Sequence, residues 1–321
     1  MTLLPLYFAP PVVDIHSHLY PPTYMSVLRT RTTPPLHILL PPPPPHPTLI
    51  NRPSVPGKPV LPSLTSPAAK LAFMDAHNIS ASILSLGNPW LDFLTSDEER
   101  AGAGDTCRSV NKDMQSLCAE HTGRLWFFAA LPVTAGVGDV LTAIAHLRNL
   151  SLCRGGLDDN AFLPVLRACA ESALPVFLHP NYGLPGEVFG PCCGDHGQVL
   201  PVSLGFTTET TVAVARMYLA GVGLLRARLA QERKTIWDVL RQNVYLDGIV
   251  FDKIPLWAAA EAVGSDRLMF GTDHPLFPNL STDGLYDICV KNQGAARDCF
   301  GEGSELEGVM GGNAVRVFNL Q

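Results

Sequence analysis

Charged residues are scarce in this sequence, and they leave no basic surplus. Asp, Glu, Lys and Arg make up 16% of the 321 residues, and the formal net charge is −6. Proteins that bind nucleic acid or an anionic membrane surface usually carry clustered positive charge, so this balance argues against both partners. The 46% of hydrophobic residues can bury a large core, which argues against a disordered protein. A small-molecule substrate is therefore the expected partner.

Long apolar runs and paired cysteine motifs are also absent. No stretch reaches the roughly 18 uninterrupted apolar residues that span a bilayer, so no membrane segment is expected. Residues 1–13 are apolar, but they lack a basic start and are interrupted by prolines, which argues against a signal peptide. The eight cysteines include no C-x-x-C pair, which is typical of reduced thiols in a cytoplasmic protein.

Alternating strands and helices are predicted along most of the chain. A length of 321 residues suits one (β/α)8 barrel, which takes about 250 residues plus insertions, so a single domain over 1–321 is expected. Short apolar runs typical of buried parallel strands lie at 12–16, 80–86, 125–131, 175–180, 243–250 and 267–271. Helical patterns lie at 67–77, 97–121, 137–149, 162–172, 208–230 and 254–263.

Two features depart from a regular barrel. Residues 30–67 are crowded with prolines, including an unbroken run at 41–45, and are expected to form a long loop without regular helix or central strand. Only the six strands above are clearly marked. A further one at 150–155 is weak, and none is evident between the helix over 208–230 and a further helix that starts near Thr235. The TIM-like barrel is therefore expected to be incomplete or distorted.

His16 and His18 are separated by one residue at the end of the first predicted strand. The two-residue repeat of a strand points both side chains to the same face, where they could chelate a metal ion. An H-x-H pair also arises by chance in a chain with ten histidines, so a solvated pair is the competing interpretation. The position of the pair at the end of a buried strand favours metal binding.

His179 and Asp273 each end a later predicted strand. Active residues of a parallel barrel lie at the carboxyl ends of its strands, where both of these residues fall. A lone strand-end histidine is usually structural, and Asp273 could equally cap the following turn. Together with the first pair, they complete a set of three imidazoles and one carboxylate, which suits Zn²⁺ and leaves room for water or a substrate.

Four motifs give the sequence a resemblance to a known family. They are V-D-I-H-S-H, H-P-N-Y-G-L-P, E-T-T-V-A-V-A-R-M-Y-L-A-G-V and R-L-M-F-G-T-D-H-P. They resemble the amidohydrolase superfamily, in the branch of aminocarboxymuconate-semialdehyde decarboxylase, and most of all the fungal uracil-5-carboxylate (isoorotate) decarboxylases. The resemblance runs with interruptions over residues 12–318. It implies that His16, His18, His179 and Asp273 hold one metal ion, usually zinc.

The resemblance further implies a carboxy-lyase that releases CO₂ from a carboxylated pyrimidine or a similar carboxylated aromatic ring, such as uracil-5-carboxylate. In such a site the substrate's carboxylate and a neighbouring oxo group would bind the metal, which orients the ring. We hypothesise that a protonated Asp273 then acts as the general acid towards the ring carbon. A hydrolase of the same superfamily is the alternative, since the same ligands can activate water.

Asn88 and Lys58 are the candidate substrate-binding residues. Asn88 follows the second strand in S-L-G-N-P-W and could hydrogen-bond a polar ring edge, although a turn-forming Asn before proline explains it nearly as well. Lys58 could neutralise a substrate oxyanion, whereas a solvated surface lysine is the simpler interpretation. Relatives usually carry an arginine in this loop and a phenylalanine where Leu276 stands, so the preferred ring could differ here.

Two departures from the family coincide with the poorly marked strands. The segment before G-L-D-D at 156–159 is shortened, which indicates that most of strand four is deleted. The A-R-M-Y-L-A-G-V helix runs on to Thr235 without the A-H-S-G-G type of strand six, whose histidine is expected to assist catalysis. A catalytically impaired remnant that keeps its metal is thus a second alternative. By resemblance, a homodimer or larger homo-oligomer is expected.

Overall fold

The described strands are mostly parallel, as the sequence predicts. The computed structural model describes residues 10–32, 37–39, 46–50, 57–135, 138, 140–141, 150–152, 163–180, 184, 186–192, 195, 199–220, 235–277, 279–282 and 284–320. The strands that pair in parallel are β1 (Val13–His18), β5 (Ala81–Ser85), β6 (Leu125–Phe127), β7 (Leu150–Leu152), β8 (Val176–Leu178), β9 (Leu246–Asp247) and β10 (Leu268–Met269).

Five of these strands lie side by side and form one continuous part of the barrel. β5 lies between β1 and β6, with Val13 opposite Ala81 and Ser82 opposite Leu125. On its other side β1 contacts the end of β10, because the amide of Ile15 donates to the carbonyl of Phe270 at 3.0 Å. β10 in turn pairs with β9. The order β9, β10, β1, β5, β6 brings the last strands of the chain beside the first, as closing a barrel requires.

The weakly marked strand at 150–155 is present as β7. It pairs in parallel with β8, and Leu150 lies opposite Val176. Strand four is therefore shortened rather than absent. Residues 221–234, where the sequence lacks the expected strand six and its histidine, lie outside the described residues.

The proline-rich region contains more regular structure than the sequence suggests. Its described residues include an antiparallel sheet and a helical turn, namely β2 (His37–Leu39), β3 (Thr48–Ile50), β4 (Lys58–Pro59) and α2 (Pro62–Thr65). The expectation of a long loop without regular elements was wrong here. The strands have only two or three residues and lie between the proline runs, and α2 begins at Pro62, where a missing N–H costs no helical hydrogen bond.

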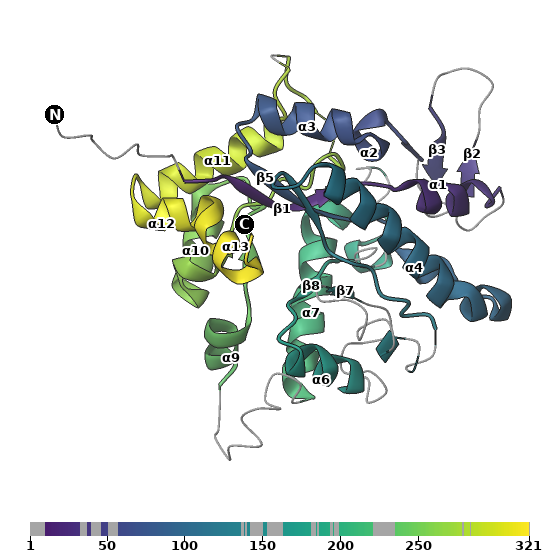
Figure 1. The fold of residues 1–321 in the computed structure, drawn as a ribbon. Coiled ribbons are helices and arrows are strands. Elements are labelled where there is room, and N and C mark those ends of the chain that lie inside the picture. Colours follow the sequence, from purple (N-terminus) through teal and green to yellow (C-terminus); the bar gives the residue numbers. More distant parts are fainter. Residues whose placement is uncertain are drawn as a thin grey trace.

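Helices surround the parallel strands (Figure 1). The longer ones are α1 (Pro22–Arg29), α3 (Pro67–Ala76), α4 (Asp97–Glu120), α6 (Leu163–Glu171), α7 (Phe206–Leu219), α9 (Ile236–Asn243), α10 (Lys253–Val263) and α11 (Asp287–Phe300). Shorter turns are η1 (Leu91–Phe93), η2 (Gly186–Phe189), η4 (Pro201–Gly205), η6 (Ser265–Arg267), α12 (Ser304–Glu307), η7 (Gly308–Gly312) and α13 (Asn313–Phe318). No helix among the described residues has the length and apolar character needed to cross a membrane.

β1 lies at the centre of the packing. All six of its residues are buried, and Figure 1 shows it crossing the middle of the molecule below α3. The largest core cluster joins α3, α4, α10, α11 and η7 through residues such as Met74, Met114, Leu256, Cys289 and Met310. Burial on all sides keeps the backbone of β1 in place, and it is β1 that carries two of the candidate metal ligands.

Candidate metal centre

The structure brings together the four residues that the sequence singles out as metal ligands. His16 and His18 lie on β1, His179 follows β8, and Asp273 follows β10. One candidate ligand atom from each of the four lies within 4.8 Å of all the others. The cluster thus lies at the carboxyl ends of three parallel strands, where barrel active sites form.

All three imidazoles are turned so that Nε2 faces the cluster. In each, Nδ1 faces an oxygen that can only accept a hydrogen bond, so Nδ1 carries a hydrogen and Nε2 is the nitrogen that can offer a lone pair to a metal ion once it is unprotonated. The pairs are His16 with the Asp247 carboxylate at 2.7 Å, His18 with the Leu86 carbonyl at 3.0 Å, and His179 with the Pro180 carbonyl at 2.6 Å. Histidines that bind metal through Nε2 are held in this way.

The inward nitrogens fit a divalent metal ion. The Nε2 atoms of His16 and His179 are buried and have no hydrogen-bond partner among the described residues. Nε2 of His18 contacts Oδ1 of Asp273 at 2.8 Å, and the same oxygen lies 3.6 Å from Nε2 of His16. A buried polar atom without a partner costs about 1–3 kcal/mol, which a ligand at this point would relieve. Three imidazole nitrogens and a carboxylate are also a typical donor set for such an ion.

The protonation states largely match those that metal binding needs. Burial lowers the pKa of His179 to about 3, so this ring is neutral at pH 7. Burial raises the pKa of Asp273, but the 2.8 Å contact with Nε2 of His18 and the nearby imidazoles outweigh it and lower that pKa to about 2. Burial lowers the pKa of His16, but Asp247 raises it to about 9. A metal ion would therefore find His179 and Asp273 ready and would displace one proton from His16.

Asp247 is a site residue that the sequence analysis missed. It ends β9, and its half-buried carboxylate fixes the His16 ring. The available signal was Y-L-D-G, which places an acid within the predicted strand over 243–250. Gly271 is a second omission: a Cβ built there would lie 2.9 Å from Cβ of His16. The lack of a side chain at Gly271 lets the end of β10 pass beside β1.

The predicted substrate-binding residues lie in the loops around the cluster. Asn88 follows β5, and its carbonyl accepts a hydrogen bond from the Tyr20 hydroxyl at 2.7 Å. Two residues further on, the Trp90 ring makes an edge contact with the ring of His179, with 4.9 Å between centroids. Lys58 lies on β4, where burial lowers the pKa of its ammonium group and the charge of the Asp273 carboxylate raises it. Both predicted residues therefore belong to segments that border the candidate metal centre.

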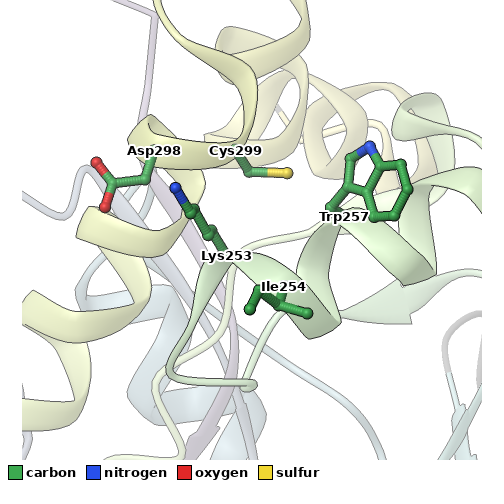
Figure 2. A pocket seen from close by; sticks show the side chains of 5 residues that line it. All are labelled: Lys253, Ile254, Trp257, Asp298 and Cys299. Atoms are coloured by element: carbon green, nitrogen blue, oxygen red, sulfur yellow. The ribbon is translucent and has the colours of Figure 1, made fainter.

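A separate surface hollow lies between α10 and α11. Figure 2 shows its lining side chains, which are Lys253, Ile254, Trp257, Asp298 and Cys299. Trp257 is 57% exposed, and none of the four clustered residues contributes to the hollow. This hollow is therefore separate from the candidate metal centre.

A family model described as Amidohydrolase matches residues 13–320, and the chain belongs to this family. The fold is a TIM-type barrel of the amidohydrolase superfamily, the class that the sequence motifs indicate. The solved relatives with this fold include several decarboxylases. The prediction of the family is thereby confirmed.

Three relatives illustrate the similarity. The solved isoorotate decarboxylase (IDCase) of Metarhizium anisopliae is 41% identical, with a TM-score of 0.86 and 97% of each chain covered. A dihydroxybenzoic acid decarboxylase of a Polaromonas species, solved with manganese and an inhibitor, shares the fold at 19% identity, with a TM-score of 0.65 and 97% of each chain covered. Decarboxylase yanB of Aspergillus niger is 26% identical over 183 residues, or 53% of this chain and 43% of its own length.

Proposed function

We propose that this chain is a metal-dependent, non-oxidative decarboxylase of a carboxylated pyrimidine or a similar carboxylated aromatic ring. The main structural support is the cluster of His16, His18, His179 and Asp273, with its imidazole Nε2 atoms turned inward at the strand ends. The 41% identity to an isoorotate decarboxylase over nearly the whole chain makes uracil-5-carboxylate the first substrate to test. The hydrolase alternative is not favoured, because the relatives are decarboxylases.

We place one zinc ion in the cluster, with manganese as the other candidate because the Polaromonas relative binds it. When bound, such an ion supplies a Lewis acid for the substrate's carboxylate and an adjacent ring oxygen. The protein's own side chains would orient the ring. Asn88 would hydrogen-bond its polar edge, Lys58 would neutralise an oxyanion, and Trp90 would limit its position beside His179.

Asp273 is the proposed proton donor. The overall reaction adds a proton to the ring carbon and then breaks the bond to the carboxylate, so that the bonding electron pair returns to the ring as CO₂ leaves. Because the pKa of Asp273 is about 2 in the free site, its carboxylate must take up this proton after the substrate has entered. Asp273→Asn is therefore expected to abolish turnover, whereas Asp105→Asn, on the exposed surface of α4, should leave it unchanged.

Product analysis tests the proposal and separates it from the alternatives. Purified, metal-loaded protein is incubated with uracil-5-carboxylate in D₂O, and CO₂, uracil and ring-opened products are measured. A decarboxylase gives CO₂ and uracil with deuterium at the carbon that lost the carboxylate. Ring opening without CO₂ would indicate a hydrolase. Folded, metal-containing protein that forms neither product from this substrate or from carboxylated benzene rings would indicate an impaired remnant, as the missing strand-six histidine suggests.

Three broader expectations complete the proposal. We propose one barrel domain over residues 1–321, a homodimer or larger homo-oligomer, and a cytoplasmic location. The location is supported by the free cysteines among the described residues, which include Cys107, Cys118, Cys169 and Cys289 in buried positions. Light scattering of the purified protein measures the oligomeric state, and limited proteolysis tests for a second domain.

A further inference from the structure

Lys70 is a fully buried lysine close to the candidate metal centre. It lies on α3, and its relative exposure is 0%. An ammonium group has three N–H donors, and three acceptors surround Nζ. They are Oγ of Ser17 at 2.6 Å, Nδ1 of His274 at 2.6 Å and the carbonyl of His274 at 3.0 Å. Burying an ammonium group costs several kcal/mol unless its partners are well placed, so a lysine buried at this position is expected to have a specific role.

All three contacts are made at the junction between β1 and the residues after β10. The His274 carbonyl also accepts hydrogen bonds from the amide of His18 at 2.9 Å and from Oγ of Ser17 at 3.2 Å. The preceding amide, that of Asp273, donates to the carbonyl of His16 at 2.8 Å. The amide of Asp273 and the carbonyl of the next residue are therefore both bonded to the strand that carries the two histidines.

The backbone of Asp273 needs this support. Its φ is 54°, in the left-handed region that costs a residue other than glycine about 1 kcal/mol or more. Such a conformation persists only where the surrounding contacts hold it. If the bonds to the His274 carbonyl weaken, the backbone can relax, and the carboxylate then turns away from the imidazoles.

α3 holds His274 through a second contact as well. Phe73, one turn after Lys70, stacks on the His274 ring with 3.6 Å between centroids and 2° between planes. Tyr286 makes an edge contact with the same ring at 5.1 Å. His274 is thus held at its ring faces and edge, at Nδ1 and at its carbonyl, and Lys70 makes two of these contacts.

We propose that Lys70 is a positioning residue, which holds the His274 peptide against β1 so that the Asp273 carboxylate faces His16, His18 and His179. Lys70 does not touch the four candidate ligands and acts through Ser17 and His274. The inference rests on the proposed function only in that these four residues are taken to bind the metal.

The test is Lys70→Met, which removes the ammonium group and keeps a chain of similar length and good helix propensity. Cobalt(II) is loaded into the metal-stripped protein, and its visible absorption and its affinity against a chelator are measured. We expect changed absorption bands and an affinity lower by about tenfold or more, as for other supporting residues around metals. Lys291→Met, at a lysine 54% exposed on α11, is the matched control and should match wild type.

A folded Lys70→Met protein with the wild-type cobalt spectrum and affinity would overturn the inference. If this variant does not fold, Ser17→Ala decides, because it keeps Lys70 and removes one of its acceptors together with the hydrogen bond from Ser17 to the His274 carbonyl. A cobalt spectrum of Ser17→Ala that differs from wild type supports the inference, and an unchanged spectrum overturns it. Because cobalt binding is read without turnover, wild-type protein that binds cobalt but releases no CO₂ would refute the proposed function alone.

Discussion

Replacing Asp247 by Asn is expected to weaken metal binding, with a loss that grows as the pH rises. Asp247 accepts the Nδ1 hydrogen of His16 at 2.7 Å, and its negative charge makes the opposite nitrogen a stronger donor to a metal. Loss of a carboxylate in this role typically costs 10–100-fold in affinity, or about 1.4–2.7 kcal/mol. The amide of Asn can still accept the hydrogen bond, so only the charge is tested.

The pH dependence follows from the proton on His16. Burial lowers the pKa of His16, but Asp247 raises it to about 9, so below this pH a metal must displace a proton from the wild-type site. At pH 7 this competition costs the wild type about 3 kcal/mol, at about 1.4 kcal/mol per pKa unit. Without the charge of Asp247, His16 releases its proton at lower pH and the competition largely disappears. The two effects offset each other near neutrality, and the intrinsic loss is fully visible only above pH 9.

Competition with a chelator of known affinity measures this effect at a series of pH values from about 7 to about 9.5. Wild-type affinity should rise up to pH 9 more steeply than that of Asp247→Asn. Asp105→Asn, which removes an exposed carboxylate paired with Arg108, should follow the wild-type curve. Parallel curves for wild type and Asp247→Asn, or equal affinities above pH 9, would refute the assigned role of Asp247.

Two further substitutions test the packing behind the site. Gly271→Ala places a methyl group 2.9 Å from Cβ of His16 and should cost about 1–3 kcal/mol of unfolding free energy as well as metal affinity. Gly294→Ala is the control, because a methyl group there meets no other part of the protein within 4 Å, and denaturant titrations should show no loss of stability. Burial raises the pKa of Asp14 to about 6, above the value of 3.8 in the unfolded chain. Its stabilising contribution is therefore present below pH 3.8 and is lost as the pH rises through 6. Relative to Asp14→Asn, the metal-free wild type should lose up to about 3 kcal/mol between pH 4 and pH 7, and a constant difference in urea titrations would contradict this.

The four clustered residues could be found from the sequence because each belongs to a local pattern. His16 and His18 sit two apart on an apolar strand, and His179 and Asp273 each end such a strand. The rule that parallel strands present their carboxyl ends on one side of a barrel then brings them together. Local spacing and one topological rule indicated the cluster, and the family resemblance completed the assignment of the four ligands.

Lys70 and Asp247 were missed because their roles depend on contacts between distant segments. A lysine in a predicted helix is normally solvated, and only its spacing to Phe73, Met74 and His77 on one helix face indicates that Lys70 is buried. The contact of Asp247 with His16 joins residues 231 positions apart. The strands of the proline-rich region escaped prediction for another reason, since elements of two or three residues are too short to show a period.

The most direct test of the central claim is to measure metal content and CO₂ release from uracil-5-carboxylate on the same samples during stepwise reloading of metal-stripped protein. If His16, His18, His179 and Asp273 form a single catalytic metal site, CO₂ release should rise in proportion to bound zinc or manganese and level off at about one ion per chain. Full CO₂ release from metal-free protein, or saturation with metal without any release, would contradict the account.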